Sequence, residues 1–136
     1  MKKLMDENKI ELDQRIIFSK PLGFLDYVFL QKNAFCVLSD SGTITEESSI
    51  LNFPAIMLRD AHERPEGMDE GTLIMSGMNK DNVVNAINIA RSFDYKNRTF
   101  RIVEDYKSLN FSKKIIKIVH SYIDFVNRTV WFKDLP

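Results

Sequence analysis

The chain has 136 residues, which is enough for one domain with a hydrophobic core of its own. Its 19 basic and 19 acidic residues balance, so composition excludes a broad electrostatic attraction to nucleic acid or to an anionic membrane surface. A single cysteine, Cys36, excludes an intrachain disulfide, and we expect its thiol to be buried and inert. No apolar run has the length of a membrane span or of a signal-peptide core, which predicts a cytoplasmic protein.

The amino-terminal part of the chain predicts one strand and one helix. Residues 1–14 are charged and predict a leader or a frayed helix. Residues 15–19 are β-branched and aromatic and predict a first strand, which ends at Pro21 and Gly23. Residues 25–32 predict a helix with apolar side chains on one face.

The central stretch changes from a strand pattern to a helix pattern. Residues 34–38 form an unbroken apolar run, which is typical of a strand buried on both faces. Turn and cap residues follow at 39–42, and a helical period then runs from Thr43 to about Asn52. A junction of this kind presents free backbone N–H groups and the positive end of a helix dipole, so it predicts an anion site.

The remaining chain continues the alternation. We expect strands at 55–58 and 72–76, helices at 79–93 and 112–127, and irregular chain at 59–71 and 94–110. We interpret 59–71 as a charged loop or a single turn, which Pro65 interrupts. The tail carries Trp131 and Phe132, which need a partner surface.

This alternation predicts an α/β fold, a three-layer Rossmann-like domain with a parallel sheet of about four strands flanked by helices. In such sheets ligands bind beyond the carboxyl ends of the strands, where residues 40–43 fall. Ser41 and Gly42 are therefore candidate ligand contacts. A capped helix start with no ligand remains the alternative at this stage.

Acidic residues follow the turn directly. Glu46 and Glu47 point about 100° apart on a helix, so they cannot both face one site. Glu47 lies within reach of a ligand held at Ser41, and neutral hydroxyls beside a phosphate would suit a carboxylate better than the phosphate itself.

A second candidate segment, residues 59–66, follows the next predicted strand. Arg64 offers a bidentate clamp for a phosphate, whereas a solvated charged loop is the alternative interpretation. His120 falls inside the last predicted helix and is interpreted as a structural or surface residue. No spacing of His, Cys and Asp predicts a metal site, and no cofactor is expected.

Together the two segments resemble the signature of the non-hydrolysing UDP-N-acetylglucosamine 2-epimerase family. The family pattern is an acidic residue with Ser-Gly-Gly and Glu-Glu, then Gly-x-Pro, a strand, and Arg-x-x-x-Glu-Arg-Pro-Glu. The matching residues are Asp40-Ser41-Gly42-Thr43-Ile44-Thr45-Glu46-Glu47, Asn52-Phe53-Pro54 and Arg59-Asp60-Ala61-His62-Glu63-Arg64-Pro65-Glu66. The resemblance covers roughly residues 15–95, and residues 122–131 resemble the branch that acts in UDP-N-acetyl-L-fucosamine synthesis for surface polysaccharides.

The resemblance implies a role for each matching residue. Ser41 and Gly42 would donate to the diphosphate, and Arg64 would lie near it. Glu47 would accept from the ribose hydroxyls, and Tyr27 would pack against the uracil. Thr43 replaces the second glycine of the pattern, so either the phosphate loop is reshaped or its hydroxyl adds a donor.

The resemblance also implies a GT-B-like architecture of two lobes with a UDP-sugar in the cleft between them. Residues 1–136 would form a single UDP-binding carboxyl-terminal lobe, with 111–136 packing on the amino-terminal lobe. The catalytic residues of the isomerase would lie in that other lobe. Three possibilities stay open: one half of an epimerase completed by a separately encoded lobe, a non-catalytic nucleotide-binding module, and an inactive remnant. A homodimer is a further expectation of the resemblance.

Overall fold

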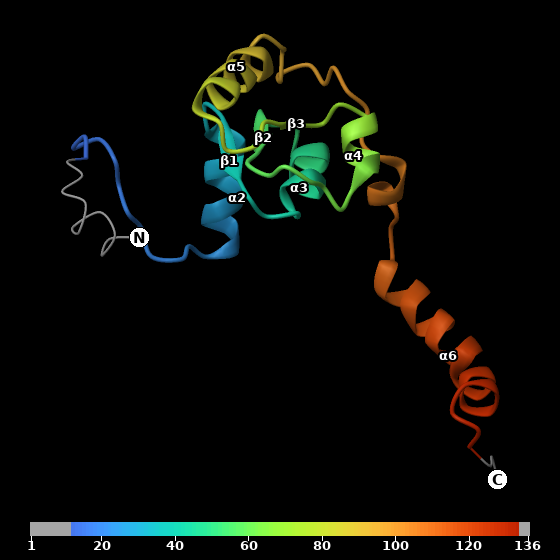
Figure 1. Ribbon diagram of the computed structural model, residues 1–136. Coiled ribbons are helices and arrows are strands. Elements are labelled where there is room, and N and C mark those ends of the chain that lie inside the picture. The colour runs from blue at the N-terminus through green and yellow to red at the C-terminus, as the bar shows by residue number, and fades with distance from the viewer. Residues whose placement is uncertain (1–11, 134–136) are drawn as a thin grey trace.

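The computed structural model describes residues 12–133 and shows an α/β fold with a separate carboxyl-terminal helix (Figure 1). The elements, in chain order, are α2 (Phe24–Asn33), β1 (Val37–Ser39), α3 (Ile44–Leu51), β2 (Ala55–Met57), α4 (Pro65–Asp69), β3 (Ile74–Met75), α5 (Lys80–Arg91), the 3-10 helix η1 (Glu104–Lys107) and α6 (Phe111–Thr129). The expected leader at 1–14 lies mostly outside the described residues.

The three strands are parallel and stand in the order β1-β2-β3. Val37 is opposite Ala55, and Ile56 is opposite Ile74, so each strand pairs with the next one along the chain. The parallel sheet is confirmed. Of the four expected strands, the prediction of the first, at 15–19, is wrong: this segment is exposed and pairs with no strand of the described chain.

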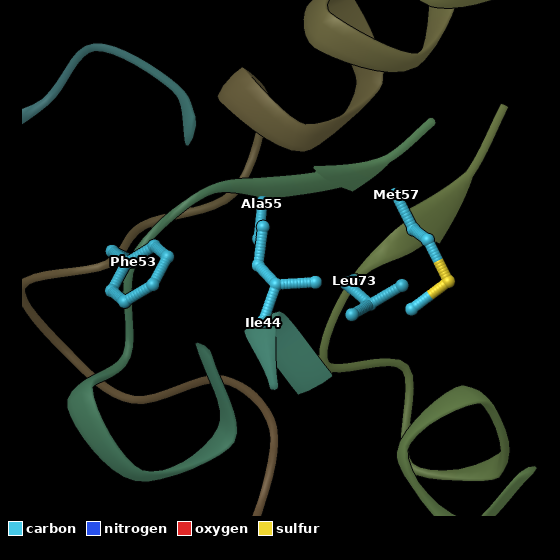
Figure 2. Close-up of a cluster of buried hydrophobic side chains, with 5 residues drawn as sticks. All are labelled: Ile44, Phe53, Ala55, Met57 and Leu73. Atoms are coloured by element: carbon cyan, nitrogen blue, oxygen red, sulfur yellow. The ribbon is translucent and has the colours of Figure 1, made fainter. Parts of the chain in front are cut away.

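Helices cover both faces of the sheet, which confirms the three-layer arrangement. On one face α3 packs against β2 through a buried cluster, whose members point toward one another in Figure 2: Ile44, Phe53, Ala55, Met57 and Leu73. On the other face Ile56 packs against Ala86 and Ala90 of α5. Successive residues of β2 therefore serve opposite layers, as the period of a strand requires.

The strand buried on both faces is β2 and not β1. The apolar run at 34–38 predicts burial on both sides, but β1 is the outer strand and Leu38 is 41% exposed. Cys36 is only half-buried; its desolvation still raises the pKa of the thiol, which keeps it protonated at neutral pH.

Two boundaries have clear local causes. Helix α3 ends at Asn52, which adopts the left-handed conformation (φ 60°) that asparagine tolerates at a helix end. Of the two possibilities for the charged segment, a loop or a single turn, the short helix forms: Pro65 begins the five-residue α4, because a helix needs no N–H at its first position.

The irregular segment 94–110 is ordered by contacts with the end of α3. Arg98 donates to the carbonyl oxygens of Ser49 (2.7 Å) and Ile50 (2.9 Å), and Asn52 donates to the carbonyl of Tyr95 (2.8 Å). The two bonds from Arg98 satisfy carbonyl groups that the end of α3 leaves unpaired.

Helix α6 stands apart from the sheet (Figure 1). None of its residues is buried, and its apolar side chains gather on one face. Trp131 beyond it is also exposed, at 61%. No helix within residues 12–133 has the length and apolar character needed to cross a membrane.

Candidate functional site

The site predicted from sequence lies at the edge of the sheet where all three strands end. Residues 40–43 follow β1, residues 58–64 follow β2, and Ser76 and Gly77 follow β3. The last two segments touch, because a Cβ at Gly77 would lie 2.5 Å from Oδ1 of Asp60. Parallel strands thus bring residues from distant parts of the sequence to one edge.

The turn after β1 is built by its own hydroxyl groups. The Ser39 hydroxyl accepts from the N–H of Ser41 (3.0 Å), and the hydroxyls of Ser41 and Thr43 lie 3.0 Å apart. Thr43 has φ −66° and ψ −16°, a right-handed helical conformation that a β-branched residue adopts without strain. The replacement of glycine by Thr43 therefore needs no reshaping of the loop, and it adds a hydroxyl to it.

Arg64 lies directly against this turn. A Cβ at Gly42 would be only 2.2 Å from Nη1 of Arg64, so the absence of a side chain at Gly42 is what admits the guanidinium. Nε of Arg64 donates to Oε1 of Glu46 at 2.6 Å, and Nη1 forms a longer ion pair with Oε2 of Glu63 at 3.9 Å. The hydrogen bond with Glu46 raises the pKa of Arg64, so the group stays charged.

Glu47 points away from Glu46 and toward α2, as their 100° separation requires. Its Oε2 accepts from the Tyr27 hydroxyl at 3.3 Å and from the side-chain amide of Gln31. Burial, followed by the charge of Glu47, raises the pKa of Tyr27, so the hydroxyl keeps its proton and remains a donor.

These residues line a groove of ≈ 370 Å³ between α2 and α3. Its walls are mostly apolar and include Phe24, Tyr27, Val28, Gln31, Glu46, Glu47, Ile50 and Leu51. The volume falls within the range of small-molecule sites, about 300–1,000 Å³. An apolar groove whose lining includes the carboxylate side chains of Glu46 and Glu47 suits a planar base and a diol better than it suits an anion.

The structure therefore brings the candidate residues together in two adjacent groups. Ser41, Gly42, Thr43 and Arg64 form a cationic turn at the start of α3, and Tyr27 and Glu47 line the groove beside it. The neighbouring residues Glu46 and Glu47 join the two groups. This arrangement suits a ligand with a phosphate at one end and neutral hydroxyls beside it.

Gln31 is the contact that sequence reasoning misses. It is 3% exposed and bonds to Glu47 across 16 positions of sequence. Its spacing of four from Tyr27 puts both on one helix face, which is the signal that was available.

The other members of the charged segment support the site without entering it. The Tyr106 hydroxyl donates to Glu66 at 2.6 Å, and this bond lowers the pKa of Glu66. Arg59 pairs with Glu63 at 3.2 Å. His62 and His120 are exposed, the latter on α6. Among residues 12–133 no cluster of His, Cys, Asp and Glu could hold a metal ion.

Comparison with known proteins gives a consistent result. Residues 1–120 match the family model described as UDP-N-acetylglucosamine 2-epimerase. A curated relative of that name from Methanocaldococcus jannaschii is 40% identical over 82 residues, which are 60% of this chain and 22% of the relative. The chain thus spans about a fifth of the length of the curated relatives it matches.

Solved structures extend the match to nearly the whole chain. The UDP-N-acetylglucosamine 2-epimerase of Rickettsia bellii is 51% identical with a TM-score of 0.84, covering 96% of this chain and 37% of that one. The unmatched remainder is shorter than α6, so the match includes this helix. The Methanocaldococcus jannaschii enzyme in complex with UDP-GlcNAc and UDP is 31% identical with a TM-score of 0.74, covering 88% and 33%.

Proposed function

The chain belongs to the UDP-N-acetylglucosamine 2-epimerase family, and we propose that it supplies the UDP-binding side of such an isomerase. The supporting observation is the placement of Arg64 against Gly42, beside the hydroxyls of Ser41 and Thr43. Glu47 and Tyr27 stand next to this cationic turn and would receive the ribose and the uracil.

In the proposed reaction the bond between C1 of the sugar and the bridging oxygen of the β-phosphate breaks as the proton on C2 is removed, and that oxygen leaves with UDP. UDP leaves, a 2-acetamidoglycal forms, and UDP adds back as a proton returns to the opposite face of C2. Negative charge grows on the β-phosphate during the first step. Arg64 and the N–H of Gly42, which donates to nothing within residues 12–133, would stabilise this charge.

The base that removes the C2 proton is assigned to the amino-terminal lobe. The chain would therefore bind UDP by itself and would catalyse only together with that lobe. We further propose that α6 and the tail, 111–136, pack on it, since α6 leaves its apolar face uncovered. A separately encoded lobe and a homodimer are the partners to test.

Calorimetric titration of the purified chain with UDP tests the proposal. We expect saturable heat at or below millimolar UDP, and a weaker signal for Arg64→Gln, which loses the charge but keeps a donor. Absence of heat from a chain shown to be folded by circular dichroism contradicts the proposal.

A non-catalytic nucleotide-binding module is the second candidate, favoured by the short share of the relatives that the chain spans. Adding the whole part of a relative that precedes the matched region, including its amino-terminal lobe, and following the interconversion of UDP-GlcNAc and its C2 epimer separates the two. Epimer formation that needs both polypeptides supports the first proposal. UDP binding without any turnover supports the second.

A further inference from the structure

The sheet has one open side, and we propose that a parallel strand from outside these 136 residues pairs with β1 there. Val37 donates to the carbonyl of Pro54 and Ser39 accepts from Leu58, both at 2.9 Å, so both residues turn their backbone groups toward β2. Alternate residues of a strand face opposite sides. The N–H and C=O of Leu38 therefore point to the open side, where no described strand lies.

Helix α2 gives a second, independent observation. Its apolar residues lie all around the helix, a pattern that is typical of helices covered on every side. Phe24, Leu25 and Phe29 are nevertheless exposed, at 78%, 79% and 66%. Helix α2 lies at the β1 end of the sheet (Figure 1), and Gln31 holds it against α3. A sheet extended beyond β1 would pass beneath α2 and bury these side chains.

The segment at 15–19 does not close the open side. It carries the pattern of a strand, yet it is exposed and lies well away from β1 (Figure 1, blue). A common order of doubly wound sheets is 3-2-1-4-5-6. The numbers give each strand's rank along the chain, and their order gives its position across the sheet. If β1, β2 and β3 are strands 4, 5 and 6, then residues 15–19, which precede α2, are strand 3. Strands 2 and 1 would then lie between residues 15–19 and β1.

The occupant that fits is the polypeptide that precedes the matched region in the solved relatives. One lobe of a two-lobed chain takes about half of it. This chain covers only 37% and 33% of the two solved relatives, so what lies outside includes part of this lobe as well as the other one. The proposal therefore revises the expectation that residues 1–136 form a whole lobe.

Two other occupants fit less well. In residues 1–11 the apolar residues are Met1, Leu4, Met5 and Ile10, which do not form the continuous apolar run that a strand beside β1 requires. A second copy of the chain, joined by a two-fold axis, would pair β1 with β1 in antiparallel directions. That pairing would leave the exposed apolar side chains of α2 uncovered.

Amide hydrogen exchange by NMR tests the proposal. The chain is prepared alone, with the segment that directly precedes the matched region in the Rickettsia bellii enzyme, and with the amino-terminal lobe of that enzyme. We expect the preceding segment to slow exchange at Leu38 and at residues 16–18 by about a hundredfold, and the amino-terminal lobe alone to leave it fast. The proposal is overturned if Leu38 is protected in the chain alone or by the amino-terminal lobe alone. It is equally overturned if the preceding segment gives Leu38 no protection.

Leu38→Pro provides a matched variant. Proline removes only the outward N–H and is tolerated on an edge strand, so the chain alone should keep its fold. Affinity for the preceding segment should fall about tenfold or more, while Leu38→Val should stay near the original value. Equal affinity of the two variants overturns the proposal. Because the exchange measurement uses the unchanged chain and no UDP, its result is independent of both the variant's folding and the proposed UDP site.

Discussion

Gly42 and Gly67 are two glycines whose missing side chains admit different neighbours. At Gly42 the neighbour is the mobile end of Arg64, 2.2 Å from an added Cβ, and at Gly67 it is Cγ2 of the buried Thr45, at 2.0 Å. Gly42→Ala should therefore displace the guanidinium and weaken UDP binding about tenfold, with a change in unfolding free energy below about 0.5 kcal/mol.

Gly67→Ala is the control for this prediction. It meets a packed core instead of a flexible tip, so it should cost about 1–3 kcal/mol of stability. Calorimetry with UDP and thermal unfolding measure the two effects. An unchanged UDP affinity in Gly42→Ala, with the fold intact, contradicts the assignment of Arg64 to the phosphate.

Gln31 acts on the site through Glu47. Its amide and the Tyr27 hydroxyl both donate to Oε2 of Glu47, which leaves Oε1 for a ligand. Oε1 of Gln31 itself is buried and has no donor within residues 12–133, an arrangement that costs stability. Gln31→Leu should therefore change stability by less than about 1 kcal/mol and yet weaken UDP binding about fivefold, because Glu47 loses its orientation.

An analogue of UDP that lacks both ribose hydroxyls separates a positioning role from a structural one. Gln31→Leu should bind this analogue as tightly as the unchanged chain does. Lys32→Leu, a neighbouring exposed position on α2, should alter neither affinity. If Gln31→Leu weakens UDP and the analogue equally, its effect does not pass through the contact of Glu47 with ribose.

At the scale of elements, α5 depends on its amino-terminal cap. Oδ1 of Asn79 accepts from the N–H groups of Asp81 (2.9 Å) and Asn82 (3.2 Å). Asn79→Ala should lower the unfolding free energy by about 1 kcal/mol, whereas Asn88→Ala, on the exposed side of the same helix, should be neutral or slightly stabilising. Urea unfolding of both variants measures the difference, and equal midpoints would show that the cap contributes nothing.

The elements that sequence predicts correctly are those whose pattern depends on their own residues. The helix start near Thr43, its end near Asn52 and the start of the next helix near Asn79 all depend on local residues, and the structure has helices at Ile44–Leu51 and Lys80–Arg91. The segment at 15–19 was predicted as a strand because its composition is right. A strand, however, exists only when another strand pairs with it, and composition does not report the partner.

In the candidate site, too, the features that depend on adjacent residues were predictable, and those that depend on packing between elements were not. The turn at Ser41 and Gly42 was predictable because strand ends and helix starts adjoin in sequence. The bond between Gln31 and Glu47 was not, since it depends on how α2 lies against α3. Leu38 was expected to be buried because an apolar run shows what a strand can tolerate, and not whether it stands at the edge of its sheet.

At the scale of the whole molecule, α6 exposes an apolar face that needs a partner. Val119, Tyr122, Ile123 and Val126 line one side of it, together with Trp131. In the absence of another lobe the chain should self-associate through this face. Val119→Asp combined with Ile123→Asp should yield a monomer in analytical ultracentrifugation without changing UDP affinity, because α6 is remote from the groove.

A control double variant on the opposite side of α6, Lys113→Asp with Lys117→Asp, carries the same two new carboxylates and lowers the net charge further, because it also removes two lysines. It should associate as the unchanged chain does. Dissociation in both double variants would attribute the effect to net charge instead of the apolar face.

The order β1-β2-β3 has a kinetic consequence. Val37 meets Ala55 and Ile56 meets Ile74, the same separation along the chain in both cases, so each pairing closes only a short loop. Proteins of low contact order fold quickly, since little chain entropy is lost before contacts form. The run from β1 to α5 should therefore act as an early folding nucleus, already assembled when a strand arrives at the open edge. In pulse-labelled refolding with that strand present, the amide of Ile56 should gain protection before the amide of Leu38.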